Sequence, residues 1–468
     1  MFNHKALEHP SKMAIAGIEH GENSFQDIVS ISAKTQKAML NLGIKSGDSV
    51  LLALTPSPLL FGIISGLMGI GVRIIFIEPW LGLDRIQHIL LMTTPKAFIS
   101  GKIGKFWGIR SKAIRSIPHW VSPSDILNQL SPGKFKIENL PSDHHAFIVF
   151  SSGTMGAPKG VVRTHQYMQD IFETFIAVEP ENLPNPDLII FPNVALFHLA
   201  TGRGSIIVPT RWREKKLKST LELCQKYKPQ TITTGPAFLK TLMDLSLLKE
   251  LKSLERIVVG GALTDCWILE KLFSDLPGRK FLHIYGGSEA EPVAVVNAET
   301  AVKLSREKGY FQTLCLGKPI PQIAHKFKEE ILWVSGPNVS GEYIGTPEQN
   351  IGIKQRDEKG KLWHCMGDRV IEEDGLLWIL GRQNQQKNDF LLEQKIYKKL
   401  NSSKSFIHRL PNNNLILIGE NIKSNSHYLQ KDFPEIQKII ERKIVRDKRH
   451  RSRIDRKKSL PTSLRQEK

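Results

Sequence analysis

The chain has 468 residues, more than one hydrophobic core usually holds, so we expect at least two domains. Its 41% hydrophobic and 24% charged residues exclude a wholly disordered chain. The formal net charge is +19, but residues 438–468 alone contain 13 Lys and Arg against 4 Asp and Glu, a net +9. The remainder carries a moderate positive charge, which suits an enzyme that binds anionic substrates.

The four cysteines are scattered along the chain, at Cys224, Cys266, Cys315 and Cys365. This spacing predicts neither a metal-ligand cluster nor a disulfide framework, and it favours a reducing compartment. The first residues, MFNHKALEHPSKM, lack the apolar core of a signal peptide. We therefore expect a cytoplasmic protein.

Residues 49–72 contain no charged side chain, a length that would span a bilayer. Pro56 and Pro58 divide this stretch into the strand-like VLLAL and the shorter LLFGIISGLMGIG. A further strand-like run, IIFI, follows Arg73. The pattern predicts a buried β-turn-α-β unit rather than a membrane span.

Short apolar runs alternate with helix-like segments over most of the chain. Several end at Gly or Pro, which is typical of buried parallel strands joined by helices. The predicted strands include 50–54, 73–77, 146–150, 187–191, 204–209, 256–261 and 281–286. We therefore predict an α/β domain over residues 1–380.

The sequence changes character after residues 375–386, GLLWILGRQNQQ, which we interpret as a linker. Residues 414–420, NLILIGE, predict a strand, and residues 434–445, PEIQKIIERKIV, predict a helix ahead of the basic tail. Residues 381–468 are therefore predicted to form a small C-terminal domain.

A glycine-rich segment at residues 151–160, SSGTMGAPKG, follows the apolar run 146–150. Glycines let consecutive N–H groups point into one anion-binding concavity and allow a close backbone approach. Three hydroxyl side chains and Lys159 add donors for a phosphate group. The spacing excludes a Walker A loop. Taken alone, the segment is either a phosphate-binding loop or a surface turn.

This segment resembles the phosphate-binding signature of the adenylate-forming (ANL) superfamily, which includes acyl-CoA synthetases, luciferases and peptide-synthetase adenylation domains. The usual form there is (S/T)-S-G-(S/T)-(S/T)-G-x-P-K-G, and this chain departs from it only at Met155. The resemblance implies a loop that binds the phosphates of ATP. Its implied residues are the catalytic Lys159 and the nucleotide-binding Ser151, Ser152, Gly153, Thr154 and Gly156.

Two segments resemble the family's motifs for the base and the metal. Residues 258–264, VVGGALT, resemble the turn lining the adenine pocket, and the matching positions are Gly260, Gly261 and Ala262. Residues 285–292, YGGSEAEP, resemble the Y-G-x-(S/T)-E motif. The resemblance implies that Tyr285 stacks on adenine beside Gly286. It also implies catalytic roles for Ser288, facing the α-phosphate, and for Glu289, which would hold Mg²⁺; a carboxylate is a ligand that Mg²⁺ prefers.

Two later segments resemble the family's ribose and hinge motifs. HCMGDRV, residues 364–370, implies that Asp368 accepts hydrogen bonds from the ribose hydroxyls. DGLLWILGRQ, residues 374–383, places Arg382 near the nucleotide. The resemblance therefore covers nearly the whole chain and implies the family's fold: a large N-terminal domain of layered sheets and helices, followed by a small α+β C-terminal cap.

The region expected to form the acyl pocket is apolar. Residues 191–209 and 233–244 contain small residues that leave room for a chain, although ordinary core packing explains them as well. No Asp or Glu lies where an amino-acid-activating enzyme needs one for the substrate ammonium. This favours a fatty or other apolar acid. The amino-acid sequence of this region and of the C-terminal segment most resembles the branch of olefin-pathway β-lactone synthetases. In that branch the hydroxyl of a 3-hydroxyacyl adenylate reacts within the same molecule to form a β-lactone.

The C-terminal segment departs from the family pattern in three ways. The hinge Asp expected after the Gly-Arg pair is Asn384, and the glycine-containing stretch that should follow is KNDFLLEQK, without glycine. The family's catalytic lysine near the end aligns with Arg453 in RHRSRID. A guanidinium fork does not replace the adaptable point charge of an ammonium. These departures argue against the second half-reaction, transfer of the acyl group to coenzyme A. They also predict weaker catalysis of the first half-reaction, formation of the acyl-adenylate.

Two histidines lie in or near the candidate site segments. His165 follows the glycine-rich segment, and we interpret it as a capping or packing residue. His198 lies within the acyl-pocket segment and is a candidate for contact with the substrate carboxylate.

The leading hypothesis is an AMP-forming acid ligase that uses ATP and Mg²⁺ to convert a fatty or 3-hydroxy fatty acid into an acyl-adenylate. The acceptor is left open among coenzyme A, a carrier protein and the substrate's own hydroxyl, the last giving a β-lactone synthetase. The competing hypothesis is a catalytically impaired nucleotide- or acyl-binding homologue. The basic tail is either a solvated face or a contact for an anionic membrane surface, while its few aromatic residues disfavour nucleic acid.

Overall fold

The computed structural model describes residues 2–77, 81–130, 133–151, 159–178, 186–307, 315–341, 343–344, 350–446 and 454–464. The side chains of residues 2, 3 and 151 lie outside this description. All structural statements below concern the described residues.

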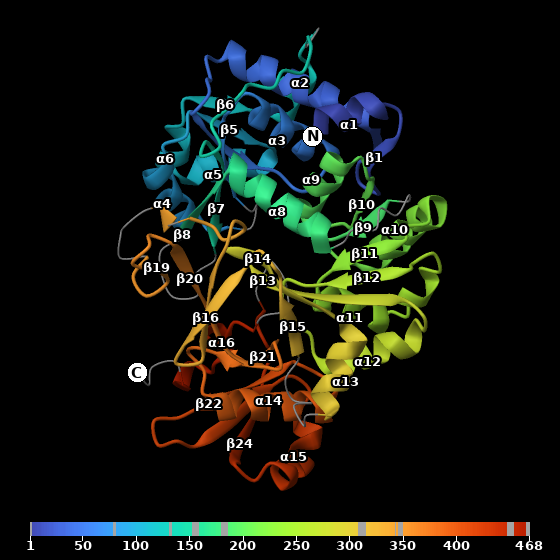
Figure 1. The fold of residues 1–468 in the computed structure, drawn as a ribbon, viewed down its shortest axis with the longest axis vertical. Coiled ribbons are helices and arrows are strands. Elements are labelled where there is room, and N and C mark those ends of the chain that lie inside the picture. Colours follow the sequence, from blue (N-terminus) through green and yellow to red (C-terminus); the bar gives the residue numbers. More distant parts are fainter. Residues whose placement is uncertain are drawn as a thin grey trace.

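The largest sheet has fourteen strands and mixes parallel with antiparallel pairing (Figure 1). Its order in space is β16-β17-β20-β21-β15-β14-β13-β12-β11-β9-β10-β1-β2, with β19 paired to β20. Its strands are β1 Met13–Gly17, β2 Gly21–Ser24, β9 Asp187–Ile189, β10 Ser205–Ile207, β11 Thr231–Thr234, β12 Arg256–Val259, β13 Lys280–Gly287, β14 Ala290–Asn297, β15 Cys315–Pro319, β16 Ala324–Lys328, β17 Ile331–Ser335, β19 Lys354–Arg356, β20 Leu362–Glu373 and β21 Leu376–Arg382.

A second sheet has seven strands in the order β18-β8-β7-β4-β3-β5-β6. The pairs among β3, β4, β5, β6 and β7 are parallel, whereas β7–β8 and β8–β18 are antiparallel. Its strands are β3 Ser49–Ala53, β4 Arg73–Phe76, β5 Ala97–Ser100, β6 His119–Val121, β7 His145–Ser151, β8 Lys159–Thr164 and β18 Tyr343–Ile344. The glycine-rich segment is therefore the connection of an antiparallel β7–β8 pair at one side of this sheet.

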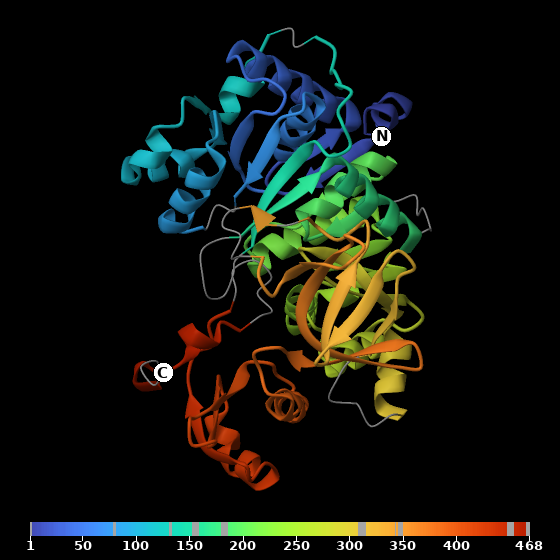
Figure 2. The same cartoon turned by 60° about the vertical axis from the view of Figure 1, so that its left-hand side comes forward.

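Helices cover these sheets and lie around the edge of the molecule in both ribbon views (Figures 1 and 2). Helices α2 and α3 pack closely against each other, and α12 packs against α13. The helices are α1 Phe2–Glu8, α2 Phe25–Asn41, α3 Pro58–Gly69, α4 Leu83–Thr93, α5 Lys102–Arg110, α6 Lys112–Arg115, α7 Pro123–Leu127, α8 His165–Val178, α9 Pro192–Thr201, α10 Glu214–Tyr227, α11 Pro236–Asp244, α12 Cys266–Asp275, α13 Ala298–Glu307, α14 Lys387–Leu400, α15 Ser426–Asp432 and α16 Arg456–Ser459.

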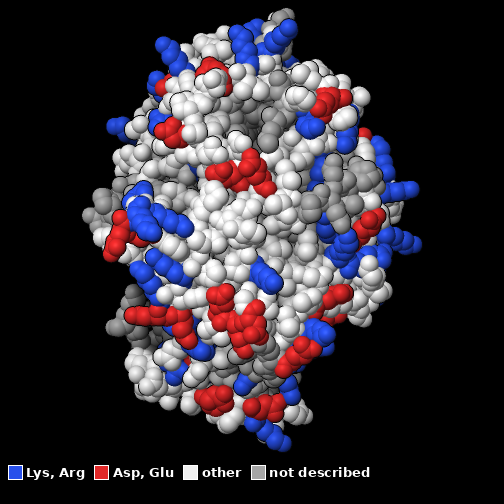
Figure 3. Space-filling model, in the orientation of Figure 1, with Lys and Arg blue, Asp and Glu red and all other residues white. Residues whose placement is uncertain are grey.

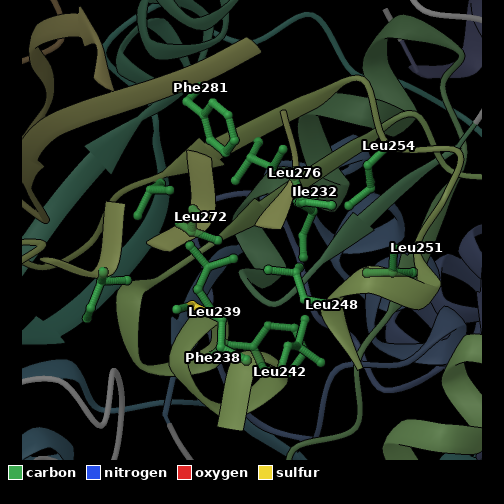
Figure 4. Packing of buried hydrophobic residues seen from close by; sticks show 14 of the residues in the cluster. Ile232, Phe238, Leu239, Leu242, Leu248, Leu251, Leu254, Leu272, Leu276 and Phe281 are labelled. Atoms are coloured by element: carbon green, nitrogen blue, oxygen red, sulfur yellow. The ribbon is translucent and has the colours of Figure 1, made fainter. Parts of the chain in front are cut away.

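The main hydrophobic core lies between β11–β13 and the helices that follow them. Figure 4 shows Ile232 of β11 and Phe281 of β13 packed with Phe238 and Leu242 of α11 and with Leu272 of α12. All five side chains are almost fully buried. Burying such a side chain stabilises the fold by about 1.5–3 kcal/mol, so this core holds the carboxyl ends of the three strands in a fixed position.

The chain from residue 387 onward gathers at the lower end of the molecule (Figure 1). Its sheet contains β22 Ser405–Arg409, β23 Leu415–Gly419 and β24 Ile436–Glu441. β24 pairs in parallel with β23. The division at residue 380 stays a prediction, since β21 continues to Arg382 and α14 begins at Lys387.

The strand predictions are confirmed. β3, β4, β7, β9, β10, β12, β13 and β23 lie in the predicted segments, and residues 49–72 form β3, a turn and α3. Within the described residues, no helix combines the length and the apolar character needed to cross a membrane.

The helix predicted over residues 434–445 is wrong. Residues 436–441 form β24, in which Ile436 is buried and the following Gln437 and Lys438 are exposed. Ile439 and Ile440 pair with Leu417 and Ile418 of β23. Pairing with a buried neighbouring strand therefore overrides a pattern that also fits a helix, because the preferences of short apolar segments are weak compared with tertiary contacts.

Buried charges connect β9, α9 and β10. Asp187 is fully buried and pairs with Arg203 and with Nε2 of His198, which lies 3.2 Å from Oδ2. Nδ1 of His198 lies 2.8 Å from Oγ of Ser205. Burial alone would raise the pKa of Asp187, but His198 and Arg203 outweigh it, so the pKa is lowered.

We expect Asp187→Asn to lower the free energy of unfolding by about 3–5 kcal/mol at neutral pH, because it leaves the buried Arg203 without its anion. Urea denaturation would measure this loss. The advantage of the wild type should shrink as the pH falls through the lowered pKa of Asp187, since the charged form is then lost.

Asp244→Asn is the matched control, because Asp244 is exposed and pairs with Lys240 one helical turn away. Its effect should stay below about 1 kcal/mol. Equal losses in the two variants would contradict the assigned role of the buried network.

Candidate active site

The carboxyl ends of the parallel strands β11, β12 and β13 meet at one edge of the large sheet, where ligands of open α/β sheets usually bind. Gly260 and Gly261 follow β12 there. A side chain at position 260 would approach the carbonyl oxygen of Ile284 to 3.1 Å, and Gly261 has a φ of +76°. The sequence therefore needs glycine at both positions to turn closely past β13, and Ala262 follows half-exposed.

Tyr285, Asp368 and Arg382 come together beside this turn. The Tyr285 hydroxyl donates to Oδ2 of Asp368 at 2.7 Å, and Nη1 of Arg382 lies 3.0 Å from Oδ1. β20 and β21 create this arrangement, since Asp368 and Arg382 face each other in the register of the two strands. Asp368 is only 4% exposed, so these two neighbours hold its carboxylate at the edge of the site.

The glycine-rich segment joins β7 to β8. Ser151 ends β7 and pairs with Lys159, which begins β8. Ser152, Gly153, Thr154 and Gly156 lie outside the described residues, as does the side chain of Ser151. The structure therefore places both ends of the predicted phosphate loop, but not its interior.

The turn between β13 and β14 carries Ser288 and Glu289, and two other segments anchor its backbone. Nη2 of Arg163, from β8, donates to the carbonyl oxygen of Ser288 at 2.9 Å. The N–H of Ser340 donates to the carbonyl oxygen of Glu289 at 2.7 Å. Gly286 is also required in this turn, because a Cβ atom there would lie 2.8 Å from the carbonyl oxygen of Ala290.

Tyr343 connects two of the catalytic residues expected from the sequence, Lys159 and Glu289. Its hydroxyl donates to Oε1 of Glu289 at 3.0 Å, and Nζ of Lys159 lies 5.3 Å from its ring centroid. Burial, followed by the charge of Glu289, raises the pKa of Tyr343, so the phenol remains a protonated donor. Gly160 makes this approach feasible, since a Cβ there would collide with Ile344 at 2.5 Å.

Lys354 adds a second ammonium group to this region. Its Nζ donates to the carbonyl oxygen of Ser340 at 2.6 Å and lies 5.6 Å from the Tyr343 ring centroid. His364 pairs with Lys354 across β19 and β20. Burial, Lys354 and Lys159 together lower the pKa of His364 well below its usual value, so the imidazole is neutral near neutral pH. The region therefore keeps a net positive field beside Glu289.

The structure thus brings the predicted residues together in two groups. One contains Tyr285, Asp368 and Arg382; the other contains Lys159 and Glu289, and Ser288 joins them through the turn. Sequence analysis missed Tyr343 and Lys354. Neither lies in a recognisable motif, and only the pairing of β18 with β8 and of β19 with β20 brings them to the site.

The two histidines have structural contacts. His198 uses both ring nitrogens within the buried network, so the hypothesis that it meets a substrate carboxylate is not supported. His165 begins α8, and its backbone N–H donates to the carbonyl oxygen of His144 at 2.9 Å. Burial and then His144 lower the pKa of His165, which agrees with the packing role.

The divergent C-terminal features are placed only in part. Asn384 is exposed in the short connection between β21 and α14. The glycine-free segment 387–395 forms the first turns of α14, which packs against β21 near Gly381. Arg453 lies outside the described residues.

A family model described as "AMP-binding enzyme" matches residues 2–348. The chain belongs to the AMP-binding enzyme family. It is accordingly an adenylate-forming enzyme of the ANL superfamily, as the motifs predicted, and an AMP-forming acid ligase. The mixed α/β fold predicted from the resemblance is confirmed as well.

Characterised relatives of this AMP-binding enzyme are distant in sequence. An olefin β-lactone synthetase of Stenotrophomonas maltophilia is 23% identical over 389 residues, which cover 74% of this chain and 69% of that protein. The peroxisomal OPC-8:0-CoA ligase 1 of Arabidopsis thaliana is 22% identical over 409 residues, covering 80% of this chain and 73% of the ligase.

Solved structures share the fold. The o-succinylbenzoate-CoA synthetase of Bacillus subtilis, in complex with an acyl-adenylate, aligns with a TM-score of 0.78 and 16% identity over 96% of each chain. The McyG A-PCP protein with phenylalanyl-adenylate aligns with a TM-score of 0.76 and 16% identity, covering 94% of this chain and 90% of that one.

The AMP-binding family accounts for the general chemistry of the site. Its members use ATP to convert a carboxylic acid into an acyl-adenylate, and this chain catalyses the same class of reaction. The two groups of polar residues described above lie at the strand ends where the nucleotide of such an enzyme is expected.

We expect Tyr343→Phe to weaken ATP binding in the presence of Mg²⁺ by about tenfold, or ~1.4 kcal/mol. The change keeps the ring near both lysines but removes the hydroxyl that orients Glu289. Calorimetric titration with ATP, with and without Mg²⁺, would show that the Mg²⁺-dependent gain in affinity is lost.

Tyr428→Phe is the control, because Tyr428 is 65% exposed on α15. An unchanged Mg²⁺-dependent affinity in Tyr343→Phe would show that Tyr343 does not position Glu289.

Proposed function

We propose that this enzyme activates a fatty or 3-hydroxy fatty acid as its acyl-adenylate. The main support is that the two acidic side chains beside the predicted acyl segments are both paired with other residues of the protein. Asp187, just before residues 191–209, is sequestered by His198 and Arg203, and Asp244, at the end of residues 233–244, pairs with Lys240 at the surface. Neither carboxylate is placed to receive a substrate ammonium.

The apolar surroundings support the same substrate class. Phe197 of α9 lies 5.1 Å from Phe175 and 6.2 Å from Phe172 between ring centroids. A Cβ atom at Gly235 would touch Phe191 at 3.5 Å and the carbonyl oxygen of Gly260 at 3.6 Å. Apolar side chains therefore extend up to the turn that we assign to adenine, which suits an acyl chain bound beside the nucleotide.

The family resemblance supports the nucleotide roles. We assign Gly260, Gly261 and Ala262 with Tyr285 and Gly286 to the base, Asp368 to the ribose, Arg382 to a position near the nucleotide, and Ser288 to the α-phosphate. Lys159 and the loop residues Ser151, Ser152, Gly153, Thr154 and Gly156 would bind the β- and γ-phosphates. Arg453 would supply a charge to the reacting carboxylate and phosphate.

The residues fit Mg²⁺. Glu289 offers hard oxygen ligands at a half-buried position, and within the described chain no group of three or more His, Cys, Asp or Glu forms a separate metal cage. This matches an ion held by one or two carboxylates together with phosphate oxygens. When bound, Mg²⁺ supplies positive charge that neutralises the phosphates. Tyr343 would orient Glu289 for this role.

The reaction is then an in-line displacement. A carboxylate oxygen of the acid attacks the α-phosphorus of ATP, a new P–O bond forms, and the bond to the β-phosphate oxygen breaks to release pyrophosphate. Lys159 stabilises the charge that develops on the leaving group, and Ser288 orients the α-phosphate. Catalysis therefore depends on positioning and electrostatic stabilisation rather than on a covalent intermediate with the protein.

A second candidate, β-lactone synthesis, concerns the next step. The 3-hydroxyl oxygen would attack the acyl carbon, the bond to AMP would break, and the hydroxyl proton would leave with the AMP phosphate or solvent. Two olefin β-lactone synthetases among the relatives, at 23% and 24% identity, favour this step. The helix α14 also occupies the segment where the glycine-containing stretch used for thioester formation was expected. Coenzyme A and a carrier protein are the other acceptors.

Exchange of pyrophosphate into ATP should depend on octanoic to octadecanoic acids or their 3-hydroxy forms. In Lys159→Ala we expect ATP affinity to fall at least about tenfold, equivalent to ~1.4 kcal/mol, because a phosphate-binding cation is lost. The exchange assay and calorimetric ATP titration measure the two effects.

Lys215→Ala is the matched control, since Lys215 is exposed at the start of α10. Unchanged ATP affinity in Lys159→Ala would contradict its assignment to the phosphates. Tight ATP binding without exchange for any of these acids would favour the impaired homologue, and recovery of exchange in Arg453→Lys would then locate the defect in the C-terminal segment.

A 3-hydroxy fatty acid supplied with ATP should give a β-lactone and AMP, detected by mass spectrometry, in the absence of coenzyme A. The corresponding acid without the hydroxyl should stop at the adenylate. Formation of acyl-CoA from both acids, with no lactone, would contradict the second candidate while leaving the adenylation proposal intact.

A further inference from the structure

A basic surface lies on the side of the molecule formed by α4, α5 and α6. From Arg85 to Ser124 the sequence contains seven Lys and Arg and no Asp or Glu. Over the whole face shown in Figure 3, basic and acidic side chains are interspersed. The three helices stand at the left in Figures 1 and 2, clear of the core around β11–β13.

Helix α5 is amphipathic in an unusual way, because its outward side carries large apolar residues as well as cations. Trp107, Gly104 and Gly108 face the interior. The exposed side holds Phe106 and Ile109, which are 48% and 76% exposed. Residues three or four positions apart in sequence lie on the same face of a helix. Phe106 and Ile109 are therefore neighbours, and the cations Lys102, Lys105 and Arg110 lie beside them.

The neighbouring helices also carry exposed cationic and apolar side chains. α6 packs against both α5 and α4 and presents the exposed Lys112. α4 presents Leu91, which is 81% exposed. On α5 the guanidinium of Arg110 lies 3.8 Å from the Phe106 ring centroid, which keeps a cation directly beside an exposed aromatic ring.

We propose that the α4–α6 surface binds the headgroup region of an anionic phospholipid bilayer. Apolar side chains projecting among lysines and arginines are typical of helices that lie in a membrane interface, where apolar insertion and attraction to anionic lipids act together. This surface is distinct from the basic C-terminal tail, and the inference does not depend on the identity of the substrate.

A bilayer fits these residues better than an acidic protein does. Ile109 and Leu91 are exposed by more than three quarters and project from the helix surface, so a soft hydrocarbon boundary can accept them without a complementary cavity. Residues 85–124 contain no carboxylate; Asp84 lies in the first turn of α4, and Asp48 pairs with Lys96. The cations of α5 and α6 therefore remain in excess and attract lipid phosphates.

Cosedimentation of the full chain with vesicles tests the proposal. We expect binding to vesicles of phosphatidylcholine with one quarter phosphatidylglycerol and little binding to phosphatidylcholine alone. The triple variant Lys102→Glu, Arg110→Glu and Lys112→Glu should lower the vesicle partition coefficient at least about tenfold. Each cation near an anionic surface contributes to the free energy of membrane binding. Phe106→Ser with Ile109→Ser should also lower the partition coefficient.

Matched controls distinguish an effect of the α4–α6 surface from an effect of the protein's overall charge. Reversing the exposed Lys215 and Lys218 of α10, together with the exposed Lys252 outside that helix, to Glu changes the net charge equally; α10 lies on the opposite side in Figure 1. Ile351→Ser removes an equally exposed apolar residue, 73% exposed, elsewhere. Near wild-type vesicle binding is expected in both controls, and unchanged far-ultraviolet circular dichroism confirms folding of every variant.

Three outcomes would overturn the proposal. One is equal binding to neutral and anionic vesicles, or none to either. Another is an equal loss in the α10 control. The third is binding of an acidic acyl carrier protein that depends on Lys102, Arg110 and Lys112 while vesicles do not bind, which would assign the surface to a protein. None of these measurements requires adenylation activity, so failure here is distinguishable from failure of the proposed function.

Discussion

Two side chains that reach from the seven-stranded sheet to the turn at Ser288–Glu289 hold the site together. Arg163 binds the carbonyl oxygen of Ser288, and Tyr343 binds the carboxylate of Glu289. The strands that flank the predicted phosphate loop, β7 and β8, belong to one sheet, and the predicted metal ligand lies between two strands of the other. Their relative position therefore depends on these contacts, which require β18 to approach β8 closely over Gly160. A larger residue there would separate the sheets at the point where ATP is expected.

Burial controls the electrostatics of this region. Tyr343 stays protonated and His364 stays neutral, so the positive charge beside Glu289 comes from Lys159 and Lys354. Lys354 is held by the carbonyl oxygen of Ser340, whose own N–H binds the Glu289 backbone. A connected set of contacts thus places a carboxylate and Lys354 around the Tyr343 ring, with Lys159 beside it. Our proposal for Mg²⁺ and the polyphosphate requires a preorganised arrangement of this kind.

Charges elsewhere have different roles. Asp187, His198 and Arg203 satisfy one another inside the protein and connect β9 to β10 through α9. This pairing sequesters Asp187, the carboxylate just before the predicted acyl segment 191–209, and it thereby supports the proposed apolar acid. The same histidine that looked like a substrate contact in the sequence is therefore a structural residue, because its two ring nitrogens already have partners.

The sequence by itself determined the family, the order of the buried strands and the nucleotide motifs, since these are encoded in short contiguous segments with glycine at the positions of closest approach. Gly260 and Gly286 are such positions: a Cβ atom would lie 3.1 Å from a carbonyl oxygen at Gly260, a tight contact, and 2.8 Å from one at Gly286, a collision. The strand at residues 436–441 was mistaken for a helix, because its pairing with β23 is a non-local contact. Tyr343 and Lys354 likewise could not be predicted. Each follows Glu289 by more than fifty residues, and only sheet pairing across the fold brings their side chains to it.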